Sequence, residues 1–306
     1  MNLYFAPLEG ITTYTFRNTH FEMFGGCTNY YAPFITPTQN DKINEKNLRD
    51  ILPSNNKIPN LKIQALSNHA PSFVDFATKV KAYGYDEINL NFGCPSSTVV
   101  KKGRGAGFLK EKDLLNKFLY DIFNKTDIKI SIKTRAGYLN CDEAEELIDI
   151  YNRYPLTKLI IHPRAREDYY NGTPCMNAFD TMYKASKNPV CYNGDILNAN
   201  DYEQIKALYP DLEGIMIGRG AIKNPAIFRE ICNGKRLTST ELIEFTEKLF
   251  ENYYELLNSD MYTLHKLKEI WVYIMQEHED CNKITKAIKK ASRVADLLTA
   301  IKQLEF

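Results

Sequence analysis

Several features that would place a chain in a special class are absent from this sequence. Its seven cysteines include no Cys-x-x-Cys pair, which excludes zinc ribbons, ferredoxin-type clusters and thioredoxin-like redox centres. No basic stretch precedes an apolar core at the N-terminus, and no apolar run is long enough to cross a bilayer. We therefore expect a cytoplasmic protein in a reducing compartment, with no metal site, no membrane contact and no obligate protein partner.

The sequence also lacks a charge excess and the common nucleotide-binding and hydrolytic motifs. With 39 basic and 38 acidic side chains the net charge is +1, so any contact with nucleic acid must come from a local patch. There is no Gly-x-x-x-x-Gly-Lys-Thr loop, no His-Glu-x-x-His and no Ser-His-Asp order. The chain is therefore not predicted to be a P-loop protein or a hydrolase.

What is present is an alternation of short apolar runs with longer amphipathic stretches. Most of the runs end at Gly, Pro, Asn or His, as buried parallel strands do. The runs are Asn2–Ala6, Asn29–Ile35, Leu61–Ala65, Glu87–Leu90, Lys129–Lys133, Lys158–His162, Pro189–Tyr192 and Gly214–Ile217. This pattern predicts an α/β fold, a (β/α)₈ TIM barrel over residues 1–237, with a doubly wound open sheet as the alternative.

After residue 237 only helical patterns follow. Thr238–Leu257, Leu264–Glu277 and Lys283–Gln303 show the periodicity of amphipathic helices. We expect residues 238–306 to form a small all-helical domain after the barrel.

Glycines and one arginine follow the last two predicted strands. In a barrel the carboxyl ends of the strands meet at the face where active sites lie, and the loops after the last two strands often bind phosphate. Gly194, Gly218 and Gly220 would let backbone N–H groups approach a phosphate, and Arg219 would add a positive charge. Tight turns would explain the same glycines.

Other predicted strands end in polar side chains. Gln64, Lys133 and His162 each stand at such an end. A lysine among apolar strands either faces the cavity or forms a structural ion pair, and a single histidine is often a satisfied core residue. Both interpretations stay open on spacing alone.

Cys94 is the candidate for proton transfer. It stands in a Gly-Cys-Pro turn directly after a predicted strand, ahead of a glycine-rich loop that carries Lys101, Lys102 and Arg104. A free cysteine can equally be a small buried apolar residue, so residue type alone does not decide its role.

Six segments at the predicted strand ends together resemble the tRNA-dihydrouridine synthase family. They are Ala6–Thr12, Asn89–Pro95, Lys133–Gly137, His162–Arg164, Asn193–Ile196 and Met216–Ala221. The resemblance runs through the whole chain in order, including a helical domain after the barrel, and the cysteine segment is its most specific part. Leu8 stands where the family usually has Met.

The resemblance implies FMN as cofactor, NADPH as reductant and a uridine of the tRNA D-loop as substrate. It implies that a hydride passes from N5 of the reduced flavin to uracil C6 while Cys94 protonates C5. It places at the flavin ring Ala6, Pro7, Leu8, Gln64, Lys133 and His162. It places at the ribityl phosphate Asn193, Gly194, Asp195, Gly218 and Arg219. At the target base it places Asn91, Arg164 and Tyr170.

The helical domain carries a basic stripe that could follow RNA phosphates. On one continuous helix, Lys283, Lys286, Lys290 and Arg293 would share a face, although a solvated surface would look the same. Further candidates for RNA contact are Lys266 and Lys268 on the preceding helix and Lys101, Lys102 and Arg104 beside Cys94.

Three other functions remain compatible with the sequence. A flavin barrel of the dihydropyrimidine or dihydroorotate dehydrogenase type would use the same phosphate loops on a small molecule, without need of the helical domain. A dihydrouridine synthase could act on ribosomal RNA. A barrel without catalytic function could bind RNA and no flavin.

Overall fold

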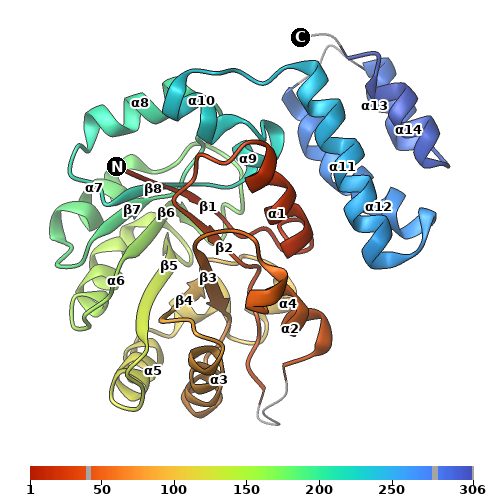
Figure 1. Cartoon of the computed structure of the whole chain (residues 1–306). Helices are drawn as coiled ribbons and strands as arrows, with labels where there is room; N and C mark the ends of the chain where they lie inside the picture. The colour runs from red at the N-terminus through yellow and green to blue at the C-terminus, as the bar shows by residue number, and fades with distance from the viewer. Residues whose placement is uncertain (39–42, 278–281, 305–306) are drawn as a thin grey trace.

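The fold is a closed parallel barrel. The computed structural model describes residues 1–38, 43–277 and 282–304. Eight strands pair in chain order, and β1 closes the sheet against β8 (Figure 1). The strands are β1 (Asn2–Phe5), β2 (Asn29–Tyr31), β3 (Leu61–Ala65), β4 (Glu87–Phe92), β5 (Lys129–Gly137), β6 (Leu159–Ala165), β7 (Val190–Tyr192) and β8 (Gly214–Ile217). The predicted barrel is confirmed, and the open sheet is excluded.

Strand lengths differ from the predictions where local chemistry intervenes. β2 is shorter than predicted because Pro33 has no N–H to donate to the sheet, and only Ile35 makes an isolated bridge to Ala65. β5 and β6 are longer, and they include Arg135 and Arg164. These arginines therefore lie on rigid strands at the rim of the barrel.

Helices between the strands cover the outside of the barrel (Figure 1). They are α1 (Tyr14–Met23), α2 (Glu45–Ile51), α3 (Ala70–Ala82), α4 (Ser97–Val100), α5 (Lys112–Phe123), α6 (Ala144–Tyr151), α7 (Met176–Ala185), α8 (Ala199–Leu208), α9 (Arg219–Lys223) and α10 (Ile227–Asn233). Their starts follow local rules, since Pro71 stands in the first turn of α3 and Asn198 forms a capping box with Asp201 at α8.

Four helices follow the barrel, one more than the sequence patterns separated. They are α11 (Ser239–Leu257), α12 (Asp260–Ile274), α13 (Asn282–Lys290) and α14 (Val294–Ile301). The prediction that Arg293 shares one helical face with Lys283, Lys286 and Lys290 is wrong, because α13 ends at Lys290. Arg293 caps α14, where its side chain pairs with Asp296 at 2.8 Å, so the chain turns between α13 and α14.

The helical segment packs directly on the barrel. The ring of Phe245 in α11 contacts Phe16 and Phe24, with centroids 5.6 and 5.2 Å apart. The Tyr253 hydroxyl lies 3.2 Å from that of Thr13. One continuous hydrophobic core includes residues of both parts. The helices are therefore held in a fixed position relative to the mouth of the barrel. Within the described ranges, no helix has the length and apolar character needed to span a membrane.

An ion pair fastens the connection between barrel and helices. Arg229 of α10, 9% exposed, donates two hydrogen bonds of 2.8 Å to the carboxylate of Glu241 in the first turn of α11. Glu241 also completes the capping box of α11 with Thr238. The hydrogen bond with Arg229, above other causes, lowers the pKa of Glu241 from 4.5 to about 2.

We expect Glu241→Gln to destabilise the protein by about 2 kcal/mol, the scale of a lost charge-assisted hydrogen bond to a buried partner. Because the folded pKa is lowered, this stabilisation is complete above pH 4.5 and is lost as the pH falls towards 2. The difference between wild type and variant, measured by denaturant unfolding, should shrink over that interval. The control is Glu203→Gln, which removes an exposed ion pair to Lys206 and should cost less than about 0.5 kcal/mol. Equal losses in the two variants would contradict the assignment.

Candidate active site

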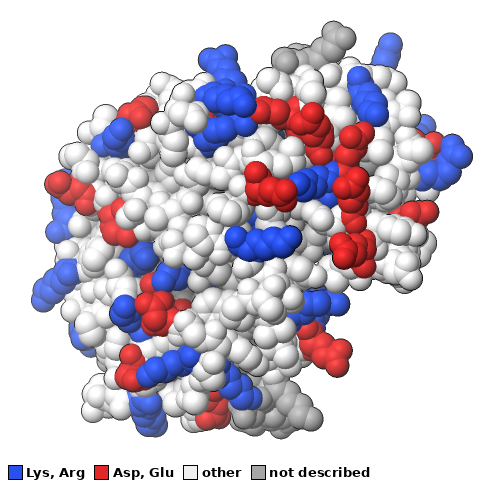
Figure 2. Space-filling model, viewed as in Figure 1, with Lys and Arg blue, Asp and Glu red and all other residues white. Residues whose placement is uncertain are grey.

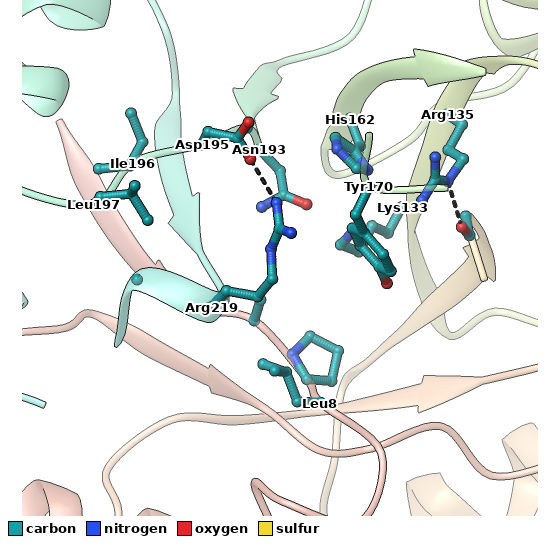
Figure 3. A pocket seen from close by; sticks show the side chains of 16 residues that line it. Leu8, Lys133, Arg135, His162, Tyr170, Asn193, Asp195, Ile196, Leu197 and Arg219 are labelled. Carbon is teal, nitrogen blue, oxygen red and sulfur yellow. Dashed lines mark hydrogen bonds and ion pairs between the residues drawn. The ribbon is translucent and has the colours of Figure 1, made fainter. Parts of the chain in front are cut away.

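Two adjoining cavities open at the carboxyl ends of the strands. The phosphate-side cavity, of about 640 Å³, is lined by the loops after β7 and β8, and the cysteine-side cavity, of about 690 Å³, reaches Cys94. The residues that line both are Pro7, Leu8, Gly93, Lys133 and Tyr170. The two form one cleft, and Figure 3 shows the phosphate side with Lys133 and Tyr170 pointing into it.

The predicted site residues are distributed over this cleft in a consistent way. On the phosphate side lie Ala6, Pro7, Leu8, Lys133, His162, Tyr170, Asn193, Gly194, Asp195, Gly218 and Arg219. On the cysteine side lie Gln64, Asn91 and Cys94. Arg164 lines neither cavity, because its guanidinium is buried behind His162 and Asp195. The structure thus brings the predicted residues together, with Arg164 as a supporting residue.

The loops after β7 and β8 meet closely at one end of the cleft. A Cβ atom on Gly220 would lie 2.1 Å from the carbonyl oxygen of Ile196, so only glycine permits this approach. Gly218 precedes α9, whose first N–H groups have no partner within the helix. The amide nitrogen of Asn193 donates to the carbonyl of Met216 at 2.8 Å and joins the two strands. This end of the cleft brings the first turn of α9 and the backbone of two glycines beside an arginine.

Asp195 positions two arginines at the phosphate end. Its Oδ1 accepts from Arg219 at 2.6 Å, and its Oδ2 accepts from Arg164 at 2.5 Å. Figure 3 shows Arg219 rising from the β8 side towards Asp195. Burial raises the pKa of the carboxyl, but Arg164 and then Arg219 outweigh it and hold the pKa below its usual value. Asp195 is therefore ionised and orients both guanidinium groups.

His162 is a neutral hydrogen-bonding residue. Burial, followed by the positive charges of Arg135 and Lys133, holds its pKa well below the ordinary value. Arg164 Nη1 lies 3.0 Å from its Nε2, and since arginine only donates, Nε2 accepts. The proton of the neutral ring is therefore on Nδ1.

Lys133 has no hydrogen bond or ion pair with any described residue. Burial, and then repulsion by Arg135, lowers the pKa of its ammonium group from 10.5 to about 8. Lys62, by contrast, sits near the opposite end of the barrel and pairs with Glu87. The structural ion pair considered for Lys133 is absent among the described residues, so its charge is available to a ligand in the cleft.

Arg135 is a site residue for which the sequence predicted no role, although it lies in the Lys133–Gly137 segment. Its Nε donates to the carbonyl of Gly93 at 2.9 Å, and its Nη1 donates to that of Ala165 at 2.8 Å. Its guanidinium lies 5.3 Å from the ring centre of Tyr170. The signal was present, since residues two apart on a strand share a face and Lys133 was already assigned to the cleft.

Tyr170 covers the middle of the cleft. Its ring stacks on His162 at 6.2 Å and lies 4.7 Å from the Arg219 guanidinium. Its side chain is half exposed on the loop between β6 and α7. The ring is thus held by cations on two sides while one part stays open to a ligand.

A chain of buried amides holds the turn of Cys94. The Gln64 amide donates to Asn89 at 2.7 Å, and Asn91 donates to Gln64 at 2.8 Å. The Asn91 Oδ1 then accepts from the backbone N–H groups of Gly93 and Cys94, at 3.0 and 2.9 Å. Asn91 therefore positions the cysteine turn, in addition to the contact with the base that the sequence predicts for it.

Cys94 is a protonated thiol at neutral pH. Burial is the largest cause that raises its pKa, and it outweighs the opposite influence of the Ser96 backbone, Arg135 and Lys133. From the far side the turn is closed by Ala106, whose N–H donates to the Cys94 carbonyl at 3.0 Å. Gly105 is needed there, since a Cβ would lie 2.8 Å from that same oxygen. The arrangement suits a proton donor and does not suit a thiolate nucleophile.

Comparison with known proteins agrees with this geometry. The family model described as "Dihydrouridine synthase (Dus)" matches residues 4–305. The chain belongs to the dihydrouridine synthase family. It is similar to "tRNA-dihydrouridine synthase B" of Proteus vulgaris, 31% identical over 235 residues that cover 74% of this chain and 69% of that protein. It is also similar to "tRNA-dihydrouridine(16) synthase" of Shigella flexneri, 23% identical, with 80% and 78% covered.

Solved structures of the same fold include a reductase and a dehydrogenase with remote sequences. "Morphinone reductase" superposes with a TM-score of 0.55 at 10% identity and covers 77% of this chain and 86% of that one. A histamine dehydrogenase from Rhizobium sp. 4-9 superposes with a TM-score of 0.57 at 12% identity, covering 81% and 49%. At this identity the likeness concerns the barrel alone.

The residues of the dihydrouridine synthase cleft fit FMN. Lys133, Arg135 and Arg219 line the phosphate side and Arg164 lies directly behind it, whereas Asp195 is the one carboxylate among the residues that line this side and His162 is neutral. A ligand with a phosphate and an electron-rich ring edge would balance this excess. The ammonium group of Lys133, which has no partner among the described residues, and the guanidinium of Arg219 are donors that such a ligand requires.

The residues predicted for RNA contact lie in different surroundings. Lys283, Lys286 and Lys290 are exposed on α13, whereas Arg293 belongs to the next helix. Lys266 donates to the carbonyl of Gly10 at 3.2 Å. In the loop after Cys94, Lys101 and Lys102 are exposed, while the Arg104 side chain donates to that of Asn68 at 3.2 Å. Lys268 caps α13 through the carbonyls of Lys289 and Ala291. RNA contact by these residues stays a prediction.

We expect FMN affinity to fall between pH 7 and pH 9, because Lys133, with a pKa of about 8, loses its charge over that interval. Lys133→Met should bind FMN roughly 10-fold or more weakly at pH 7, the scale of a lost charge-assisted hydrogen bond, and its affinity should not change with pH. Quenching of flavin fluorescence measures both. Lys129→Met, at the exposed start of the same strand, should behave as wild type. Parallel pH profiles for wild type and Lys133→Met would contradict this role.

Proposed function

We propose that this protein reduces a uridine of tRNA to 5,6-dihydrouridine, and that Cys94 supplies the proton. Membership of the dihydrouridine synthase family supports the reaction, and the names of its relatives support tRNA as the substrate. The observation that carries the assignment to Cys94 is its fixed turn: Asn91 accepts from the backbone N–H of Cys94, and both residues line the cleft together with Lys133. Bound FMN supplies the hydride, and a nicotinamide coenzyme, NADPH, supplies its electrons.

Each residue of the cleft has a task in this proposal. Lys133 and His162 Nδ1–H donate hydrogen bonds to the polar edge of the flavin ring, and Arg219, oriented by Asp195, binds the phosphate together with Gly194 and Gly218. Asn91 and Gln64 keep Cys94 in place. Because the thiol stays protonated at neutral pH, it donates its proton to uracil C5 as the hydride arrives at C6, and solvent then restores the proton.

The helical segment offers a surface for the tRNA. Lys283, Lys286 and Lys290 share one face of α13 at helical spacing and are exposed. Figure 2 shows that acidic side chains gather over α11, which would repel phosphates there. RNA would therefore approach along α13 and the barrel rim, with a D-loop uridine flipped into the cleft. We place this activity in the cytoplasm, where tRNA is modified.

We expect Cys94→Ala to separate the two half-reactions. NADPH should reduce the bound flavin at the wild-type rate, because the thiol has no part in that step. Reoxidation of the flavin by tRNA should slow by roughly 10²–10⁴-fold, as for the loss of a general acid. Stopped-flow flavin absorbance measures both steps.

The matched control is Cys232→Ala, an exposed cysteine distant from the cleft, which should leave both steps unchanged. Normal reoxidation by tRNA in Cys94→Ala would assign the proton to another group. Equal slowing of the two steps would indicate a structural cysteine.

Reversal of two charges on α13 should weaken tRNA binding. We expect Lys286→Glu with Lys290→Glu to lower affinity and to flatten its dependence on salt, by about 0.9 log unit for each lost duplex phosphate contact. Flavin content and NADPH oxidation should not change. Binding measured between low and high salt gives the slope.

The control for this pair is Lys125→Glu with Arg153→Glu, two exposed cations in the loops before β5 and β6, at the opposite face of the barrel. They should not alter the slope. An unchanged slope in the α13 variant would leave its lysines as an ordinary solvated surface.

A further inference from the structure

A third cavity, the seam cavity, lies between the barrel and the helices. It is open to solvent on one side, and its empty space is about 810 Å³. Its barrel side includes the loop after β1, Pro33 and Phe34 after β2, and α2. Its other side is the end of α11, with Leu256 and Leu257. None of the residues assigned above to flavin or target base belongs to it.

The seam cavity continues from the catalytic cleft. Glu9, Pro33 and Phe34 line both the seam cavity and the cysteine-side cavity. A ligand that enters beside Cys94 therefore reaches the seam cavity across this shared edge. Tyr273 of α12 lines the cysteine side, so the helical segment contributes to both cavities.

The lining of the seam cavity suits a planar ring that carries a negatively charged group. The rings of Phe34, Tyr14 and Tyr253 and the side chains of the two leucines provide the apolar walls. At the rim, Lys46 and Arg49 stand three residues apart on α2 and have no ion pair with any described residue. Glu9 has no hydrogen bond or ion pair with a described residue, but it is near enough to Lys46 and Lys266 for their charges to oppose the burial that raises its pKa. Asp50 also lines the cavity and is paired with Arg17. A phosphate would lie on the outer side of Lys46 and Arg49, away from the acidic surface of α11.

We propose that the seam cavity binds the base of a nucleotide next to the target uridine, with its phosphate at Lys46 and Arg49. The inference rests on the proposed function, since it takes the RNA to be the ligand in the cleft. Neighbouring nucleotides are covalently joined, so a uridine drawn towards Cys94 brings its neighbour to the shared edge of the two cavities. Stacking of that base on aromatic and apolar side chains would hold the flipped strand and help select the modified position.

The experiment is a double-mutant cycle between protein and RNA. The target uridine is first mapped in an unmodified tRNA transcript, and two tRNAs are then made with an abasic ribose on its 5′ or 3′ side. For the wild type, one of these should bind roughly 5- to 150-fold more weakly, the range for loss of one stacked base. Leu257→Trp, which fills the seam cavity, should bind intact tRNA weakly and lose no further affinity with the same abasic tRNA.

Several controls separate the possible results. Leu208→Trp places the same ring at an exposed site on α8 and should behave as wild type. Lys46→Ala with Arg49→Ala removes only exposed cations and should flatten the salt dependence of tRNA binding, whereas Lys125→Ala with Arg153→Ala should not. This second pair tests the site even if Leu257→Trp does not fold, because no packing contact is lost.

Three outcomes would overturn the proposal. The first is that the affinity losses from the abasic tRNA and from Leu257→Trp are additive. The second is that the wild type binds both abasic tRNAs as tightly as intact tRNA. The third is that Leu257→Trp raises the NADPH concentration needed for flavin reduction without RNA, which would make the seam cavity a site for the reductant. Failure of the proposed function is a different observation, because the wild type would then form no dihydrouridine in intact tRNA.

Discussion

The cleft depends on an excess of positive charge that the protein leaves uncompensated. Lys133, Arg135, Arg164 and Arg219 converge on the mouth of a closed barrel, and Asp195 is the one carboxylate among the residues that line the phosphate side. Burial of a cation without an acidic partner costs free energy, and this cost lowers the pKa of Lys133. The cost is tolerated because an anionic cofactor would offset it. Burial, and then the charges of these cations, lowers the pKa of His162 and keeps it neutral, so it serves as a hydrogen-bond donor and not as a further cation.

Beside these cations, buried amides hold the turn of Cys94, and Arg135 donates to the Gly93 carbonyl of the same turn. Amides of Gln64, Asn89 and Asn91 form a buried chain that ends on the backbone of Cys94, where charged partners would have shifted the thiol towards thiolate. Burial instead raises its pKa and keeps the proton that the reaction requires. The dihydrouridine synthase cleft thus has a phosphate side rich in cations, suited to an anionic cofactor, and a cysteine side where buried amides fix a protonated thiol. The helical segment, fixed through Phe245 and the Arg229–Glu241 pair, extends the cysteine side into the seam cavity.

Much of this arrangement could be predicted, and the errors have physical causes. The strand ends were recognisable because buried parallel strands read as apolar runs that stop at polar residues, and β3 and β8 have the predicted bounds. β2 was predicted too long because Pro33 was not treated as the end of pairing. Arg293 was placed on one stripe with Lys283, Lys286 and Lys290 because its spacing from them is helical, whereas in the structure it caps the next helix through Asp296. Arg135 lacked a role because a strand pattern shows which face a side chain is on, but not which carbonyls it reaches.

The sequence by itself determined the barrel, the residues at its mouth and the family to which the chain is similar, because periodicity and motif order are local properties of the chain. Which of those residues contact one another, and so the role of each in the cleft, was decided by the tertiary structure alone. Only the closed barrel brings Asp195 between Arg164 and Arg219, turns Asn91 towards the backbone of Cys94, and leaves Lys133 without an acidic partner among the described residues. The seam cavity also has no signature in the sequence, since it forms where α2 and the end of α11, about 200 positions apart, face each other. Contacts between distant segments depend on how the layers pack, and no local pattern encodes that distance.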